Sequence, residues 1–450
     1  MATLLALARE CVPSPSLVRA RVRDASDDTA ADALARSSDI DDACFASKLS
    51  ALRDALGQHN RPPCRRRDDD APEPPKRMVE EIIDDDARDA NEDDDDGWTH
   101  AFLAVATHAR ADAAEGVPEW SSAAASTIAA SIGDEYFNMS NELTQGFVLA
   151  ALTAMFHALE TPKDSLKMGG DDADARALVS ARQLHWLVSS IVSSPFNDND
   201  ECDDVRRRIV PCVLRAMDYP SHAVKMYGAR CAARLSSASA ASRRDDDYVA
   251  PLLDASRSAL IGATPDIWPY ALESACNFTV KRNGQEKEYR LTFTRILDAA
   301  SLHAMDVKYA APALKTLPSF IENANLYVVP HLARIFSLFG AYLQSYNDDV
   351  SIGAANAMRV AAERAWPRVA ARCATTWPEL KRAYAEADGR AAKKCDELRR
   401  AIERVGEVLQ LAAGEQFTSI WSADPNVPEH AADFVAFLKS LPSKKISSHA

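Results

Sequence analysis

The segment RRRIVPCVLRAMDYPSHAVKMYGARCAARL, from Arg206 to Leu235, decides how the rest of the chain is interpreted. Two apolar, alanine-containing halves meet at Tyr219-Pro220-Ser221, a combination that is typical of a tight turn. The segment is therefore predicted to form two helices joined by a turn. Such a hairpin can belong to a mixed fold, or it can be one unit of a repeat.

The second half of this segment has three counterparts further along the chain. Each copy opens with a β-branched residue, and a small residue follows four positions later. Positions four apart lie on the same face of a helix, so we expect all eight residues to pack against a neighbouring helix. The β-branched positions, spaced 43, 40 and 43 residues apart, and their small partners are Val224 and Gly228, Ile267 and Ala271, Val307 and Ala311, and Val350 and Ala354.

A proline in the opening turn is expected to mark the preceding helix, at Pro211, Pro251 and Pro330. Successive prolines are separated by about one and then about two periods of roughly 40 residues, which is the period of HEAT and armadillo helix pairs. With only 15 Gly among 450 residues, little in the composition opposes helix formation. The predicted fold is all-α: a HEAT/armadillo-like superhelical solenoid of antiparallel helix pairs over residues 98–450, clearest over 205–373.

Residues 280–292 allow two interpretations. Asn283-Gly284 lies between polar, partly β-forming stretches, which is the signal of a β-hairpin. Its position between two repeat helices fits a long loop instead.

The negative charge of the chain is concentrated in one tract. The formal charge is -14, and residues 68–96 hold 15 acidic against three basic residues, so the remainder carries only about -2. Blocks of like charge interrupted by proline bury too little apolar surface to fold. We therefore predict an N-terminal helical segment over 1–60 and a disordered acidic linker over 61–97.

Four apolar residues interrupt this linker: Met78, Val79, Ile82 and Ile83. Their spacing would place them on one stripe of a short helix. They belong either to a solvated spacer or to a docking segment for a partner protein.

No motif for catalysis, cofactor or metal binding occurs: there is no phosphate-binding glycine loop, nucleophile elbow, His-Glu dipeptide or C-x-x-C pair. The nine scattered cysteines are typical of a cytoplasmic or nuclear protein. The nearly neutral remainder lacks the basic footprint of a nucleic-acid binder, and the apolar runs are shorter than a membrane helix needs. We therefore expect a protein that is not an enzyme, needs no cofactor, and binds proteins rather than nucleic acid or membrane.

Three segments resemble the Tel-two-interacting protein two family, a subunit of the Triple T complex. They are RRRIVPCVLRAMDYPSHAVKMYGARC, YVVPHLARIFSLFGAYLQ and AMRVAAERAWPRVAARC, all within about Val205 to Cys373. The resemblance implies an all-helical scaffold that acts with the two other, larger Triple T subunits. Through these subunits, the resemblance implies that the protein assists Hsp90 in the maturation of phosphatidylinositol-3-kinase-related kinases.

The most telling part of this resemblance is Trp366-Pro367-Arg368 at the end of a repeat helix. Arg368 is the candidate anchor for a partner, with Trp366 as its packing support. Trp366 could instead be a core aromatic that caps the repeat stack. Two other functions stay open, another HEAT scaffold of the nuclear transport or phosphatase type and a repeat-based enzyme.

Overall fold

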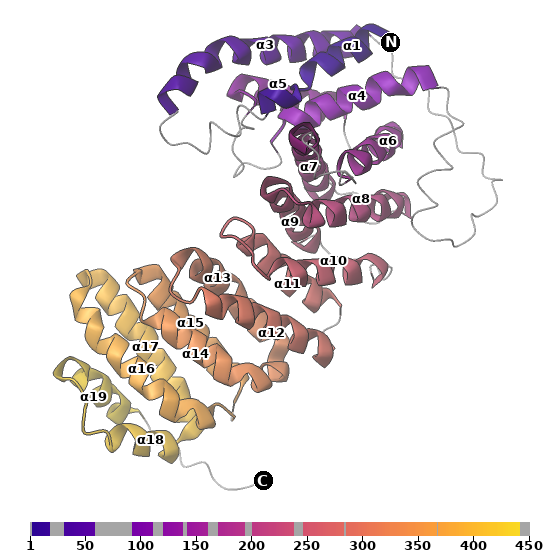
Figure 1. The fold of residues 1–450 in the computed structure, drawn as a ribbon. Coiled ribbons are helices and arrows are strands. Elements are labelled where there is room, and N and C mark those ends of the chain that lie inside the picture. The colour runs from indigo at the N-terminus through magenta and orange to yellow at the C-terminus, as the bar shows by residue number, and fades with distance from the viewer. Residues whose placement is uncertain are drawn as a thin grey trace. The chain divides into compact units, whose positions relative to one another are not determined.

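The computed structural model of the protein describes residues 2–18, 31–58, 92–110, 120–137, 142–160, 170–193, 200–237, 246–282, 285–366 and 368–441. Every regular element in these ranges is a helix and none is a strand (Figure 1). The all-α prediction is therefore confirmed. The chain divides into two compact units, Met1–Arg243 and Arg244–Ala450.

The second unit is a stack of helix pairs closed by a short cap. In each pair a first helix turns back into a second one. The pairs are α10 (Asp246–Ala259) with α11 (Trp268–Lys281), α12 (Glu286–Leu302) with α13 (Val307–Ala324), α14 (Leu332–Leu343) with α15 (Asp348–Arg364), and α16 (Cys373–Glu386) with α17 (Ala392–Ala413). The 3-10 helices η1 (Asn325–His331), η2 (Arg368–Arg372) and η3 (Ala387–Gly389) lie in the connections, and α18 (Glu415–Ser422), η4 (Glu429–Ala431) and α19 (Ala432–Ser440) form the cap.

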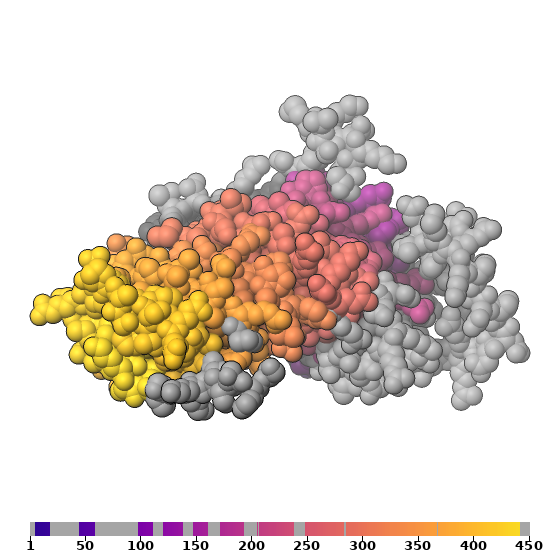
Figure 2. Space-filling view, turned by 90° about the horizontal axis from the view of Figure 1, so that it is seen from below, coloured from indigo at the N-terminus to yellow at the C-terminus, as the bar shows by residue number. Residues whose placement is uncertain are grey.

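Corresponding helices of successive pairs contact one another. α10, α12, α14 and α16 form a first layer, whereas α11, α13, α15 and α17 form a second layer (Figure 1). A helix pair cannot bury its apolar face alone, and stacking gives neighbouring pairs a shared core. This is the predicted HEAT/armadillo-like solenoid. Figure 2 shows the same unit from another side, in rose through orange to yellow.

The first unit contains the remaining described helices. These are α1 (Ala2–Cys11), α3 (Ala31–Gln58), α4 (Glu92–His108), α5 (Ala123–Tyr136), α6 (Glu142–Ala158), α7 (Gly170–Ser193), α8 (Asp200–Asp218) and α9 (His222–Ser237). α6 and α7 contact α8 and α9 as pair against pair, while α1 and α3 contact α4 and α5. The core at the centre of the unit is aromatic, with Phe102 in edge contact with Phe137 and Trp186.

The domain boundaries differ from those expected. Residues 1–60 do not form a separate segment, because α1 and α3 share the first unit with α4 and α5. The expected linker ends too late, since α4 begins at Glu92. Residues 61–91, including the stripe from Met78 to Ile83, lie outside the described residues.

Six of the eight predicted packing residues are buried as expected. Gly228 shows why a small residue is needed, because a Cβ there would lie 2.6 Å from the backbone nitrogen of Met217 on α8. Such a distance cannot be met without moving backbone, so glycine allows α8 and α9 to approach. The buried six are Val224, Gly228, Ile267, Ala271, Val350 and Ala354.

The prediction is wrong for Val307 and Ala311. Val307 is 38% exposed, and Ala311 is also exposed. Val224 and Val350 are the third residues of their helices, whereas Val307 is the first residue of α13, directly after the capping residue Asp306. The third residue of α13 is Tyr309, and the buried pair four apart is therefore Tyr309 and Ala313.

The opening-turn position of the prolines is also wrong, both for Pro211 and for Pro251. Pro211 is the twelfth residue of α8 and Pro251 the sixth of α10, whereas Pro330 lies in η1 before α14 begins. The helices of the earlier pairs extend further toward the N-terminus than proline placement alone indicates, since acidic residues open both α8 and α10.

Residues 280–292 form neither a hairpin nor a long loop. α11 continues to Lys281 and α12 begins at Glu286, so the connection is short. The apolar residues that suggested strands face the core of the stack instead: Phe278 and Phe293 are buried, and the Phe293 ring packs 4.6 Å from that of Phe320 on α13. Burial of these side chains in the tertiary structure therefore favours helix over strand in this segment.

One described stretch, Val307–Leu343, is long and apolar enough by composition to cross a membrane. It is not one helix in the fold, because α13 ends at Ala324 and Asn325 adopts a positive φ of 49° before η1 and α14. Each of these helices buries one face in the stack.

Candidate partner-binding surfaces

Large apolar side chains are exposed where first helices turn into second helices. We call Ile261, Leu302, Met305 and Tyr346 the turn edge; they lie in or beside the α10–α11, α12–α13 and α14–α15 turns. Leu302 is 80%, Met305 77% and Tyr346 99% exposed. Because both layers of helices stack in order, their connecting turns follow one another along one edge of the unit.

These turns are fixed by local contacts that leave the apolar side chains outside. The Asp306 carboxylate accepts a hydrogen bond from the Lys308 backbone at 2.9 Å and starts α13. The Asn347 side chain caps α15 through the Val350 backbone at 3.1 Å. The exposed side chains therefore sit on ordered backbone, which lowers the entropy cost of ordering a partner contact.

Trp366 and Arg368 lie at the other kind of turn, between one repeat and the next. Trp366 follows α15 and is 43% exposed, so it is not a fully buried core residue. Arg368 is exposed, and its backbone nitrogen donates a 2.7 Å hydrogen bond to the Ala365 carbonyl. Both side chains are accessible in the described structure.

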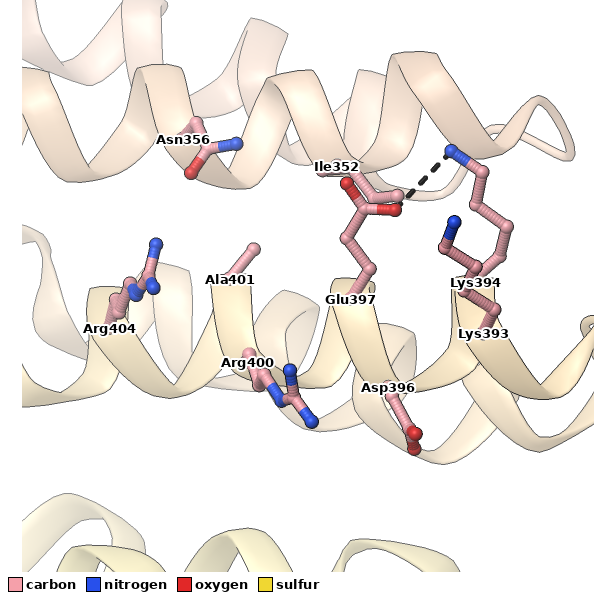
Figure 3. Close-up of a pocket in the computed structure, with 9 residues that line it drawn as sticks. All are labelled: Ile352, Asn356, Lys393, Lys394, Asp396, Glu397, Arg400, Ala401 and Arg404. Atoms are coloured by element: carbon pink, nitrogen blue, oxygen red, sulfur yellow. Dashed lines mark ion pairs between the residues drawn. The ribbon is translucent and has the colours of Figure 1, made fainter.

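A groove of about 740 Å³ separates α15 from α17. Ile352 and Asn356 line it from α15, and seven residues between Lys393 and Arg404 line it from α17. Figure 3 shows Lys393 and Arg404 reaching from α17 toward α15, and Asn356 pointing back into the gap. The lining holds four basic residues, Lys393, Lys394, Arg400 and Arg404, against two acidic ones, Asp396 and Glu397.

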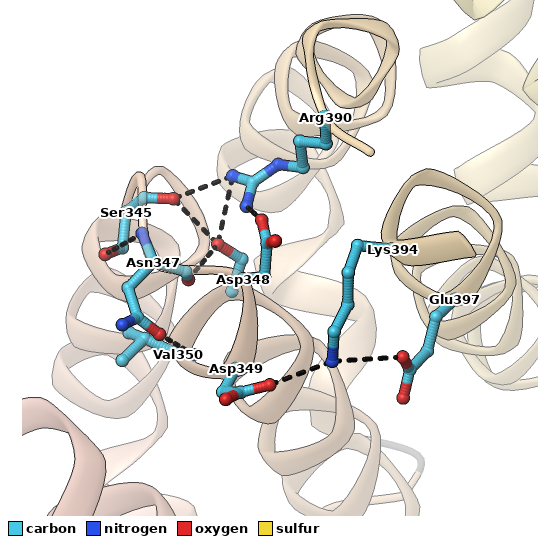
Figure 4. A network of polar contacts seen from close by, with 9 residues as sticks. Ser345, Asn347, Asp348, Asp349, Val350, Arg390, Lys394 and Glu397 are labelled. Atoms are coloured by element: carbon cyan, nitrogen blue, oxygen red, sulfur yellow. Dashed lines mark hydrogen bonds and ion pairs between the residues drawn. The ribbon is translucent and has the colours of Figure 1, made fainter. Parts of the chain in front are cut away.

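Ion pairs at one end of this groove fix α17 against α15. The Lys394 ammonium lies 2.9 Å from Asp349 and 3.3 Å from Glu397, and these carboxylates raise the Lys394 pKa (Figure 4). The Arg390 guanidinium lies 2.5 Å from Asp348 and donates to the Ser345 carbonyl at 2.7 Å. The start of α17 is thereby tied to the α14–α15 turn.

A second groove lies between α11 and α13 in the same layer. Its volume is about 260 Å³, and its charged lining is one acidic and one basic residue, Glu273 and Lys315. The two grooves occupy comparable places between successive second helices. Only the α15–α17 groove has an excess of basic residues.

The six cysteines in the described part of the chain are buried thiols. Burial raises the pKa of the Cys212 and Cys373 thiols to about 12 and about 11. A protonated buried thiol is a poor nucleophile and a poor metal ligand. Within the described ranges, no three His, Cys, Asp or Glu side chains gather as a metal site.

Sequence reasoning missed the turn edge and the basic groove. The turn edge could have been predicted from the single large apolar residues that stand in otherwise polar turns of the sequence. The groove also left a signal, because Lys393, Glu397, Arg400 and Arg404 follow helical spacing along one face. That face could be assigned to a groove only once α15 was known to lie beside α17.

Comparisons with known proteins give relatives without an assigned role. No protein-family profile matches the chain. An uncharacterized protein of Arabidopsis thaliana, At2g39910, is 25% identical over 281 residues, which is 59% of this chain and 62% of the relative. The chain thus matches less than two thirds of that relative's length. The crystal structure of an engineered protein aligns with 95% of this chain and all of its own at a TM-score of 0.42 and 13% identity.

Proposed function

We propose that the protein is a non-catalytic helical-repeat scaffold and a subunit of the Triple T complex. Its direct partners would be the two other subunits of that complex. Through them it would assist Hsp90-dependent maturation and stability of phosphatidylinositol-3-kinase-related kinases, in the cytoplasm, the nucleus or both. The assignment to this complex rests on the sequence resemblance within Val205–Cys373, and the scaffold role rests on the fold and its exposed surfaces.

The turn edge is the observation that carries the scaffold role. Leu302, Met305 and Tyr346 each leave most of their surface in water. Burying one such side chain at an interface stabilises a complex by about 1.5–3 kcal/mol before the costs of association. Exposed apolar side chains that recur along successive repeats are typical of a protein-binding surface.

Trp366 and Arg368 offer a second contact in this proposal. Tryptophan and arginine are the residues most often found to dominate binding energy at protein interfaces. The indole of Trp366 supplies apolar surface, and the Arg368 guanidinium supplies directed hydrogen bonds. Together with the turn edge, they give the second unit apolar and cationic contacts at two kinds of turn.

A capture experiment tests the proposal with full-length protein and the two other Triple T subunits from the same organism. The variants are Leu302→Glu with Met305→Glu, Arg368→Glu, and a deletion of residues 68–91, which ends before α4. Lys315→Glu is the matched control, because it also reverses the charge of a side chain on the second unit, away from both turns.

We expect the full-length protein to capture both subunits. At least one of the two variants, the Leu302/Met305 variant or the Arg368 variant, should fail to capture at least one subunit. Circular dichroism of each variant checks that the helices are intact. Failure of the full-length protein to capture either subunit would contradict membership of the complex. Loss of capture with the deletion alone would move the contact to the acidic tract and its apolar stripe at Met78, Val79, Ile82 and Ile83.

A further inference from the structure

The α15–α17 groove carries more positive charge than its own ion pairs neutralise. Lys394 is already held by Asp349 and Glu397. Across the described residues, Lys393, Arg400 and Arg404 form no ion pair, although they line the same groove. This surface belongs to a chain whose formal charge is -14.

Arg400 and Arg404 place two like charges on the groove. They stand four residues apart on α17, on the same face of the helix, where like charges repel each other. α17 buries its opposite face through Leu398, Ile402 and Val405, so it cannot rotate to separate these charges from the groove. An external anion would relieve the repulsion.

The groove also contains groups suited to a peptide rather than to a small anion alone. The Asn356 side chain faces the gap and offers both a donor and an acceptor to a peptide backbone (Figure 3). Ile352 and Ala401 add apolar lining between the charged groups. A volume of about 740 Å³ exceeds what one phosphate or carboxylate fills.

The spacing of the cations defines the ligand further. Arg400 and Arg404 lie about 6 Å apart along the helix axis, close to the roughly 6.7 Å between alternate residues of an extended strand. Lys393 lies about 16 Å from Arg404 along the helix axis, and its long, flexible side chain reaches a carboxylate four extended residues away, at about 13 Å. Guanidinium groups bind carboxylates through paired hydrogen bonds.

We propose that this groove binds an extended acidic segment of a partner protein, about six residues long, with carboxylates at alternate positions. Arg400 and Arg404 bind two of these carboxylates, and Lys393 binds a third near the start of α17. Asn356 binds the peptide backbone between them. This inference does not depend on the Triple T assignment, because it rests only on the lining of the groove.

Fluorescence anisotropy with full-length protein tests this proposal. The probe is a labelled eight-residue peptide with glutamate at alternate positions and valine or alanine between, and the reference peptide carries glutamine in place of glutamate. The protein variants are Arg400→Glu with Arg404→Glu, and Asn356→Ala. Lys315→Glu in the α11–α13 groove is the control, since it reverses one charge in a groove without an excess of basic residues.

We expect the glutamate peptide to bind at low salt, the glutamine peptide to bind at least about tenfold more weakly, and binding to fall with added salt. The double reversal should weaken binding about tenfold or more, and Asn356→Ala by a smaller factor. Lys315→Glu should leave it unchanged. Arg400→Gln with Arg404→Gln, which removes charge without adding repulsion, should weaken binding in the same direction.

Three results would overturn the proposal. One is equal binding of the glutamate and glutamine peptides. Another is equal loss of binding in the Lys315 control and the double reversal, which would indicate nonspecific attraction. The third is tight binding of inositol hexakisphosphate without binding of the acidic peptide, which would identify a small-anion site. Because these measurements use no Triple T subunit, their outcome is separate from that of the capture experiment.

Discussion

Two of the polar links between neighbouring repeats in the second unit differ in burial. In the buried link, Arg257 of α10 meets Glu288 of α12 with side chains 7% and 11% exposed. In the surface link, Arg390 and Lys394 near the start of α17 meet Asp348 and Asp349 of α15, and the Asp349 side chain is 85% exposed (Figure 4). Both links pair basic side chains with carboxylates, but the two sets of side chains differ in how much they are exposed to solvent.

The buried link is a network in which the charges depend on one another. The Arg257 Nη2 atom lies 2.7 Å from Glu288 Oε2, but it donates its hydrogen bond to the Glu288 carbonyl oxygen at 2.9 Å. Arg257 Nε donates to Thr292 Oγ1 at 2.9 Å, and Arg282 lies 3.1 Å from the other Glu288 oxygen. Removing one member leaves a charge in a low-dielectric environment, which costs far more than losing a solvated pair.

The main effect of the surface link is to fix where the start of α17 lies. The Asp349 side chain is 85% and the Lys394 side chain 35% exposed, so water and salt screen their attraction. The pair nevertheless keeps the start of α17 beside α15 and so defines one end of the basic groove. The comparison teaches that in this fold burial, rather than the number of ion pairs, decides how much a polar contact stabilises.

The largest effect is expected for Glu288→Ala in the buried link. The substitution leaves Arg257 buried with only the exposed Asp254 carboxylate, 3.3 Å away, as an ionic partner, and should destabilise the α10–α12 region by about 3–5 kcal/mol. Hydrogen exchange of the α10 and α12 amides measures this as lost protection. The matched variant is Arg257→Met with Glu288→Leu, which should cost much less because no buried charge is left unpaired. Equal costs for the two variants would show that packing, not charge burial, dominates this link.

The next effect concerns pH and a buried polar group in the first unit. Burial lowers the pKa of His108 from 6.5 to about 4, although the Cys11 carbonyl accepts from its Nε2 at 2.7 Å. A lowered folded pKa means that the unfolded chain takes up the proton first. Stability from neutral His108 is therefore complete above pH 6.5 and is lost as pH falls toward 4, by about 3 kcal/mol in all.

Urea unfolding of full-length protein between pH 7 and pH 4 measures this loss. Carboxylates also titrate in this range, so the comparison is with His108→Gln, which has no ionisable group at that position. We expect the wild type to lose more stability than the variant between pH 6.5 and 4. Parallel curves for the two proteins would show that His108 is not desolvated in solution.

The smallest effects are expected in the surface link, and they should be graded by exposure. Arg390→Ala removes hydrogen bonds to Asp348, Ser345 and Ser351 from a side chain only 15% exposed, and should cost about 1–2 kcal/mol. Lys394→Ala should change stability much less, and any change should vanish in high salt. Thermal melts at low and high salt measure both. A larger loss for Lys394→Ala than for Arg390→Ala would contradict the ranking by burial.

The sequence determined the class of fold through its period. Val224, Ile267 and Val350 are separated by about one and then about two periods of roughly 40 residues, and each is buried, because a helix pair must place its apolar face in the same way every time it stacks. The packing of Gly228 against a neighbouring helix was also predictable from the sequence, since only a residue without a side chain allows the approach of α8.

Only the tertiary structure decided the features that depend on neighbours distant in sequence. The register of α13 was shifted by two residues because the start of that helix relative to Asp306 is set by its cap, not by the period. Residues 286–292 became helical because Phe293 and Glu288 found partners on α13 and α10. The basic groove likewise exists because α15 lies beside α17, and no pattern within α17 reports what its charged face lies against. Local spacing fixes which residues share a face, whereas packing fixes what that face meets.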